Sequence, residues 1–264
     1  MATAVICEFN PFHNGHKYLL ESAKNVLKEP VIAIMSGSFT QRGEVAVCDK
    51  FVRAKSALEN GADLVLELPV VFSLSGAEGF AKAGVAIASA FDCTNHLAFG
   101  SESGDCELLK KSANAVCDER VQALVRDGMK NGGYYPRELE NAVKTVFGDE
   151  ISSVLCEPNN ILGVEYIKAL NGTGVEPFSV ARTGVAHDSR IAGEGFASAS
   201  HIREMLRNGE NAKKYAPHIP DEITFPENLD RPLLYRLRTM TREDIAKLPN
   251  VGAVSYTHLT LPTT

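Results

Sequence analysis

Residues 7–16 read Cys7-Glu8-Phe9-Asn10-Pro11-Phe12-His13-Asn14-Gly15-His16 and separate two segments of contrasting pattern. Before them, Ala4-Val5-Ile6-Cys7 is a short apolar run typical of a buried strand. After them, residues 16–28 repeat apolar side chains at helical spacing. The stretch is therefore predicted to be a strand-to-helix turn that places two histidines at the start of a helix.

The same alternation continues along the chain. Further strands are predicted at residues 31–35, 63–68, 96–99 and 178–182, and helices at residues 49–58, 77–89, 158–170 and 202–207. Residues 107–147 are more helical and more charged, which indicates a helical insertion before the sheet resumes. Continuous apolar strands alternating with helices favour an α/β fold with a Rossmann-like parallel sheet, in which ligands bind beyond the carboxyl ends of the strands.

Length, net charge and cysteine content narrow the class of protein to which the chain can belong. The chain has 264 residues, a formal net charge of −6 and six scattered cysteines without a C-x-x-C pair. The negative charge argues against non-specific nucleic-acid binding, although it leaves room for a local basic patch. The cysteines are expected to be reduced thiols. Neither a membrane-spanning run nor a signal peptide is recognisable, so a cytoplasmic protein is expected, and no protein partner is indicated.

The chain end has an unusual composition. Residues 254–263 read Val254-Ser255-Tyr256-Thr257-His258-Leu259-Thr260-Leu261-Pro262-Thr263 and resemble a translated frame of a sequencing-library adaptor. We expect residues 252–264 to be a non-native tail and the chain to be a fragment. An ordinary polar tail is the alternative.

The histidine pair carries the chemistry. A helix start presents unpaired N–H groups and partial positive charge, so it favours phosphate. His13 and His16 lie on one side of the first turn and suit an α-phosphate that gains charge, and Gly15 allows a nucleotide to approach the backbone. A lone H-x-x-H is usually two surface histidines, and a zinc pair would need a third ligand that has no support in the sequence. The preceding strand and Asn-Pro turn favour the nucleotide interpretation.

Longer strings make the resemblance specific. The H-x-G-H motif after a first strand resembles the nucleotidyltransferase superfamily related to class I aminoacyl-tRNA synthetases. Further strings are Met35-Ser36-Gly37-Ser38-Phe39-Thr40-Gln41-Arg42-Gly43-Glu44, Ala62-Asp63-Leu64-Val65-Leu66-Glu67-Leu68-Pro69, Phe99-Gly100-Ser101-Glu102 and Pro158-Asn159-Asn160-Ile161-Leu162-Gly163. Together they resemble the bacterial tRNA(Met) cytidine acetate ligase family over residues 4–250.

The resemblance implies a reaction. ATP, with Mg²⁺, and acetate would give acetyl-adenylate and pyrophosphate, and the acetyl group would pass to N4 of the wobble cytidine of elongator tRNA(Met). His13 and His16 would be catalytic. ATP contacts are implied for Ile6, Cys7, Glu8, Phe9, Asn10, Pro11, Phe12, His13, Asn14, Gly15, His16, Lys17, Tyr18, Leu19, Gly100, Asn159 and Arg182. Residues 1–208 would form the nucleotidyltransferase-like ATP-binding domain, and residues 209–251 the beginning of a truncated helical domain.

The three implied ATP contacts outside residues 6–19 can also be explained without a ligand. Gly100 is otherwise a turn glycine, Asn159 a helix N-cap and Arg182 a solvated arginine. Residues 198–203, Ser198-Ala199-Ser200-His201-Ile202-Arg203, resemble the superfamily's late phosphate motif, but a capped surface helix explains them nearly as well.

A basic stretch follows the second predicted strand. Its members are Gln41, Arg42, Lys50, Arg53 and Lys55. In one interpretation they contact tRNA or pyrophosphate, and in the other they form a solvated helix face. Asp63 and Glu67 suit magnesium in principle, but most such pairs are structural, and no metal ligand is assigned.

Two other functions compete with the ligase. One is an adenylyltransferase that joins AMP to a small phosphorylated acceptor, and the other is a nucleotide-binding module without catalysis. The intact H-x-G-H motif disfavours the module, and the longer strings disfavour the adenylyltransferase.

Overall fold

A computed structural model describes residues 1–182 and 195–248. Its contacts divide the chain into two compact units, residues 1–223 and 224–264. The five strands of the first unit are β1 Ala2–Cys7, β2 Val31–Ser36, β3 Leu64–Leu68, β4 Thr94–Ser101 and β5 Glu176–Ala181. Its helices are α1 Asn14–Leu27, α2 Lys50–Glu59, α3 Val70–Ser73, α4 Ala77–Ser89, α5 Cys106–Cys117, α6 Glu119–Lys130, α7 Tyr135–Phe147, α8 Asp149–Ser153, α9 Pro158–Leu170 and α10 Ala199–Arg207, with a short 3₁₀ turn, η1, at Val154–Cys156.

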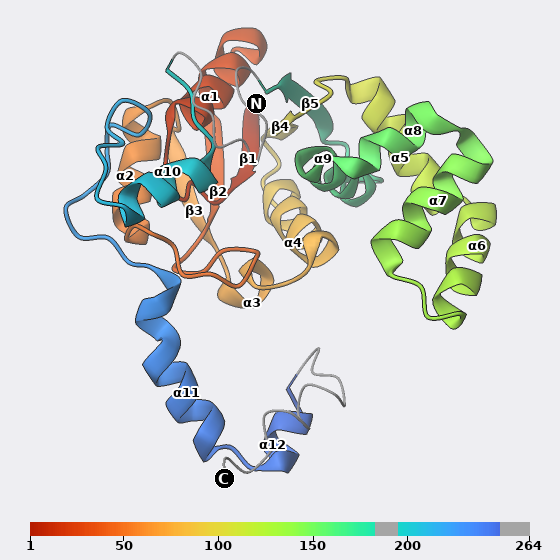
Figure 1. Cartoon of the computed structure of the whole chain (residues 1–264). Coiled ribbons are helices and arrows are strands. Elements are labelled where there is room, and N and C mark those ends of the chain that lie inside the picture. The colour runs from red at the N-terminus through yellow and green to blue at the C-terminus, as the bar shows by residue number, and fades with distance from the viewer. Residues whose placement is uncertain (183–194, 249–264) are drawn as a thin grey trace. The chain divides into compact units, whose positions relative to one another are not determined.

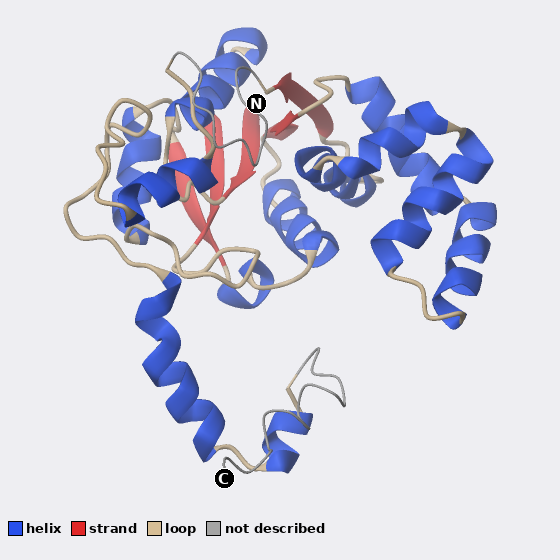
Figure 2. Ribbon diagram, in the orientation of Figure 1, coloured by secondary structure: helices blue, strands red, loops and turns tan. Residues whose placement is uncertain are grey.

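The sheet is parallel throughout, in the order β3-β2-β1-β4-β5 (Figure 2). In the central pairing, Val5 lies opposite Ala33 and Ile6 opposite Ile34. The chain runs outward from β1 to β3 and then returns to β4 on the other side of β1. The predicted α/β fold with a parallel sheet is confirmed, and the strand order reverses between β1 and β4.

Helices cover both faces of the sheet (Figure 1). Successive strand residues contribute to opposite layers. One core cluster joins Ile6, Ile34 and Leu97 to Phe80 of α4 and Val164 of α9. The other joins strand residues to α1 and α2: Val5, Ala33, Ala98, Leu20 and Ala57. Because side chains alternate along a strand, each apolar run supplies both cores, which explains the absence of polar alternation in the sequence.

The helical insertion lies between β4 and β5 and begins with α5, α6 and α7. The predicted span of residues 107–147 corresponds to these three helices, and α8, η1 and α9 lead back to the sheet. The helix α3, which follows Pro69, was not predicted, because a segment this short shows no helical periodicity.

Residues 209–223 fold within the first unit. Ala212 and Ala216 are buried in a small cluster with Ile202 of α10. The Tyr215 carbonyl accepts the N–H of Asn14 at 2.9 Å, which joins this segment to the start of α1.

The second unit contains a 3₁₀ turn, η2 Pro226–Leu229, followed by α11 Asp230–Thr239 and α12 Arg242–Ala246. The division into a catalytic domain and a truncated helical domain stays a prediction. The proposed tail at residues 252–264 lies outside the described residues. Across the described ranges, no helix has both the length and the apolar character to cross a bilayer.

Candidate active site

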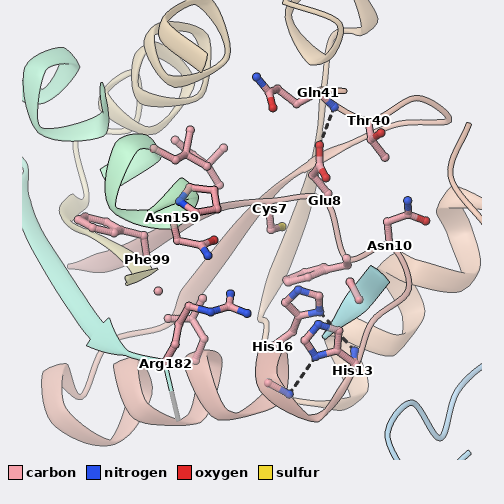
Figure 3. A pocket seen from close by; sticks show the side chains of 18 of the residues that line it. Cys7, Glu8, Asn10, His13, His16, Thr40, Gln41, Phe99, Asn159 and Arg182 are labelled. Atoms are coloured by element: carbon pink, nitrogen blue, oxygen red, sulfur yellow. Dashed lines mark hydrogen bonds between the residues drawn. The ribbon is translucent and has the colours of Figure 1, made fainter. Parts of the chain in front are cut away.

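A pocket opens at the carboxyl ends of β1, β4 and β5. The reversal of strand order between β1 and β4 is the position where open α/β sheets bind ligands, because the flanking loops diverge there. Of the residues predicted to contact nucleotide, those that line the pocket are Ile6, Cys7, Glu8, Phe9, Asn10, His13, Gly15, His16, Tyr18, Leu19, Gly100, Asn159 and Arg182. Figure 3 shows Arg182, Phe99 and Asn159 on one side of the histidine pair and Glu8, Gln41 and Thr40 on the other.

Four predicted residues are not part of the pocket lining: Pro11, Phe12, Asn14 and Lys17. Phe12 packs in the core beneath α1. The Asn14 side chain donates to the carbonyls of Gly195 and Lys214 at 2.8 and 3.0 Å. Asn14 thus fastens the start of α1 to segments much later in the chain, and Phe12 anchors the turn in the core.

Both histidines are neutral at neutral pH. Burial, and then the positive charges of Arg182 and Arg203, lower the pKa of His13 to about 3. Burial, followed by His13 and Arg182, holds the pKa of His16 well below its usual range. A neutral imidazole has one N–H donor and one acceptor nitrogen, so the surrounding hydrogen bonds decide which nitrogen carries the proton.

Backbone N–H groups settle the tautomer of each ring. His13 Nδ1 accepts from the N–H of Gly15 at 3.0 Å, and His16 Nδ1 accepts from the N–H of His13 at 3.3 Å. These bonds are a reciprocal cap on the start of α1. Because both Nδ1 atoms are acceptors, the proton of each neutral ring lies on Nε2. The rings stack with centroids 3.7 Å apart, and they supply two neighbouring N–H donors to the pocket.

Acid should therefore destabilise the fold through His13. The unfolded histidine takes up a proton near pH 6.5, whereas folded His13 does so only near pH 3. As the pH falls from about 6.5 towards 3, the free energy of unfolding therefore decreases by up to about 1.4 kcal/mol per pH unit. Urea unfolding should give a steeper loss of stability between pH 7 and pH 5 for the parent than for His13→Asn. Parallel slopes would contradict the assigned pKa.

Gly15 is explained by the position of His13. A Cβ at residue 15 would lie 2.8 Å from His13 Cε1 and 3.0 Å from His13 Nδ1. The His13 ring is buried and stacked on His16, so it has little freedom to move away. The sequence suggested that Gly15 admits the nucleotide to the backbone; the structure adds that it admits the His13 ring.

Asn159 presents an amide whose orientation is fixed. Its Nδ2 donates to Glu102 Oε1 at 2.6 Å, which turns Oδ1 away from this carboxylate. Glu102 also accepts the backbone N–H groups of Asn159 and Asn160, at 3.3 and 2.8 Å. The N-cap of α9 is Glu157, so the plain interpretation of Asn159 as the N-cap is wrong.

Arg182 lies where β5 leaves the sheet. Its backbone N–H donates to the Ser101 carbonyl at 3.0 Å, which extends the pairing of β4 and β5 by one residue. Its Nε is buried and has no hydrogen-bond partner in the described part of the chain. Burial lowers the pKa of Arg182, partly offset by Glu102, but a guanidinium remains charged at any physiological pH. An unpaired buried N–H beside the histidines is suited to a ligand oxygen.

The predicted basic stretch divides into several roles. Gln41 and Arg42 line the pocket, whereas Lys50 pairs with Glu67 at 2.7 Å. Asp63 pairs with Lys24 at 2.8 Å, so both candidate acids have lysine partners. Over the described residues, no cluster of three or more histidine, cysteine or acidic side chains is arranged to hold a metal ion.

Both interpretations of Arg53 are wrong, because its side chain is only 1% exposed. Nε donates to the Cys48 carbonyl at 3.1 Å, and Nη1 donates to the carbonyls of Glu8 and Ser36 at 2.5 and 3.1 Å. Nη2 donates to the Gly37 carbonyl. One guanidinium thus joins the segments that follow β1 and β2 at the edge of the pocket.

Several polar residues of the pocket were absent from the predicted set: Thr40, Glu44, Tyr166, Ser200 and Arg203. Arg203 Nη1 donates to the Asn10 carbonyl at 2.9 Å, which connects α10 to the β1–α1 turn. The motif at residues 198–203 was the available signal for Ser200 and Arg203. Ser198 caps α10 by accepting the N–H of His201 at 3.1 Å. Residues 198–203 therefore form a capped helix and also supply residues to the pocket.

The fold and this site define the class: the chain belongs to the HIGH nucleotidyl transferase family, whose profile matches residues 1–253. Within that class its similar proteins are tRNA(Met) cytidine acetate ligases, as the longer sequence strings indicated. The protein of that name from Thermoanaerobacter sp. (strain X514) is 40% identical over 228 residues, which are 83% of this chain and 57% of that protein. The one from Thermosipho africanus is 35% identical over 262 residues, 92% of this chain and 62% of that protein.

Solved structures agree with the sequence comparison. Thermotoga maritima TmcAL is 32% identical with a TM-score of 0.88, and the match covers 98% of this chain and 67% of that one. The same protein bound with alpha-thio ATP gives a TM-score of 0.86, covering 98% of this chain and 66% of that one. The chain spans under two thirds of the length of the curated relatives described above.

Proposed function

We propose that this chain carries the catalytic site of an ATP-dependent ligase. The enzyme forms acetyl-adenylate from acetate and transfers the acetyl group to N4 of the wobble cytidine of elongator tRNA(Met). The observation that carries the proposal is the stacked pair of His13 and His16, whose Nε2–H groups serve a pocket at the strand-order reversal. The names of the relatives and the ATP analogue bound to TmcAL support it.

The geometry of the pocket supports a role for each residue in this reaction. ATP binds in the pocket, with its α-phosphate at His13 and His16 and a phosphate oxygen at the unpaired Nε of Arg182. A carboxylate oxygen of acetate attacks the α-phosphorus, the bond to the bridging oxygen breaks, and pyrophosphate leaves. The two neutral imidazoles donate N–H groups to the phosphate as its charge grows, without giving up a proton.

Gly100 and Asn159 bind the nucleoside portion of ATP. Asn159 suits this role because Glu102 fixes its amide and leaves Oδ1 as an acceptor for a hydroxyl or amine. ATP enters as its Mg²⁺ complex, because Mg²⁺ is held largely by substrate phosphates and needs few protein ligands. We place the enzyme in the cytoplasm, where tRNA is modified.

ATP–pyrophosphate exchange with and without acetate tests the proposal. Label should enter ATP only when both ATP and acetate are present, because the exchange reverses adenylate formation. A phosphorylated acceptor in place of acetate tests an adenylyltransferase instead. Exchange that is indifferent to acetate, or that needs the phosphorylated compound, would refute the ligase.

A further inference from the structure

The pocket wall contains a tyrosine hydroxyl that the roles above do not use. Tyr166 of α9 is 2% exposed and lines the pocket. Among the described residues its hydroxyl makes no hydrogen bond, and it is not one of the fully enclosed polar atoms, so it reaches the space of the pocket. An unpaired hydroxyl that opens into an otherwise largely enclosed pocket is available to donate to a ligand.

Tyr166 lines the pocket together with Cys7 and Glu8, which stand at the carboxyl end of β1. Burial, and then the neighbouring ionisable groups of Cys7 and Glu8, raise the pKa of Tyr166 well above its usual range. The phenol is therefore neutral and serves as a donor. Cys7 and Glu8 directly precede the turn that holds His13 and His16, so a small molecule at Tyr166 lies beside the proposed α-phosphate position.

The surroundings of the hydroxyl are apolar. The Tyr166 ring packs against Phe99, with centroids 5.5 Å apart, and belongs to the same core cluster as Ile6 and Phe80. Leu162, one turn earlier on α9, also lines the pocket. A polyphosphate needs many donors, whereas one hydroxyl in an apolar wall fits a short acid with a carboxylate at one end and a methyl group at the other.

The nearby acid Glu8 does not exclude an anionic substrate. Glu8 Oε1 accepts the N–H of Gln41 at 2.6 Å. Burial raises the pKa of Glu8, and the Gln41 hydrogen bond and the positive charges of Arg203, Arg42 and Arg53 offset part of this rise.

We propose that the Tyr166 hydroxyl donates a hydrogen bond to one carboxylate oxygen of the short acid substrate, with the methyl group against Phe80 and Leu162. The other carboxylate oxygen is then free to attack the α-phosphorus. This inference rests on the proposed function, because it locates the acid in the same reaction.

The test is Tyr166→Phe, measured by acetate-dependent ATP–pyrophosphate exchange. The KM for acetate should rise about 10- to 100-fold, the loss expected for one hydrogen bond to a charged group, while the KM for ATP stays unchanged. The melting temperature should not fall, because the change keeps the ring and removes a hydroxyl that makes no hydrogen bond to the described residues. Tyr235→Phe is the matched control, since Tyr235 is 72% exposed in α11.

The outcomes separate the alternatives. A raised KM for ATP with an unchanged KM for acetate would overturn the inference and assign the hydroxyl to the nucleotide. Unchanged values for both substrates would overturn it and leave Tyr166 as a core residue. Absence of acetate-dependent exchange in the parent chain would refute the proposed function itself, and the inference with it.

Discussion

Replacing His16 by alanine should slow acetate-dependent adenylate formation about 10²- to 10³-fold. The variant loses an Nε2–H that is positioned before the phosphate gains charge, and removal of one such preorganised donor costs about 3–4 kcal/mol in the barrier. The fold should survive, because among the described residues the ring makes one hydrogen bond, the 3.3 Å cap to the His13 N–H. Loss of such a cap costs about 1 kcal/mol.

The measurement is the exchange rate at saturating ATP and acetate, with melting temperature as the check on folding. His16→Gln, which keeps an N–H donor on a side chain of similar reach, should recover part of the rate. His218→Ala is the matched control, because His218 is exposed, pairs with Glu59 at 3.5 Å and is not among the pocket residues. A His16→Ala variant with parental exchange would refute the catalytic assignment.

The parts predicted best from the sequence were those fixed by local patterns. The apolar run that became β2 and the small-residue run that became α4 gave their elements within one residue, because each segment has a clear period and clear boundaries. The parallel sheet followed from uninterrupted apolar strands. The turn at His13 was recognisable because strand, turn and amphipathic helix occur in sequence order.

The parts that were missed depend on contacts between distant segments. Tyr166 falls on the buried face of α9, where a sequence indicates only a core residue and not whether its hydroxyl finds a partner. Arg203 contacts the turn at Asn10, although it lies in a helix 193 positions later in the chain. Spacing within a helix cannot reveal such contacts, because the partner groups are backbone atoms of other segments.

Arg53 shows the same limit most clearly. A charged residue in an amphipathic helix is normally solvated, and its neighbours Lys50 and Lys55 are the basis for that expectation. In α2, however, Arg53 shares the buried face with Ser56 and Ala57. Its partners are carbonyl groups, which every residue has and which leave no mark in the sequence.

Replacing Arg53 by methionine should lower the free energy of unfolding by about 3–5 kcal/mol, because several buried carbonyls lose a charged donor at about 1–3 kcal/mol each. Methionine keeps the apolar stem but leaves the carbonyls of Glu8, Ser36, Gly37 and Cys48 without these donors in a buried place. Urea denaturation measures the change, and Lys55→Met on the same helix is the control. Its side chain is 76% exposed, so it should shift stability by no more than about 0.5 kcal/mol.

The Arg53 variant should also bind ATP more weakly than its stability alone explains. The carbonyls it releases belong to the segments after β1 and β2, and these segments supply Glu8, Thr40 and Gln41 to the pocket. Calorimetry at a temperature where the variant remains folded separates this effect from unfolding. A loss of stability below about 1 kcal/mol would mean that the desolvation cost of the guanidinium cancels its four hydrogen bonds. In that case Arg53 would not hold the pocket edge together, and the positions of Glu8 and Gln41 would depend on their own 2.6 Å hydrogen bond.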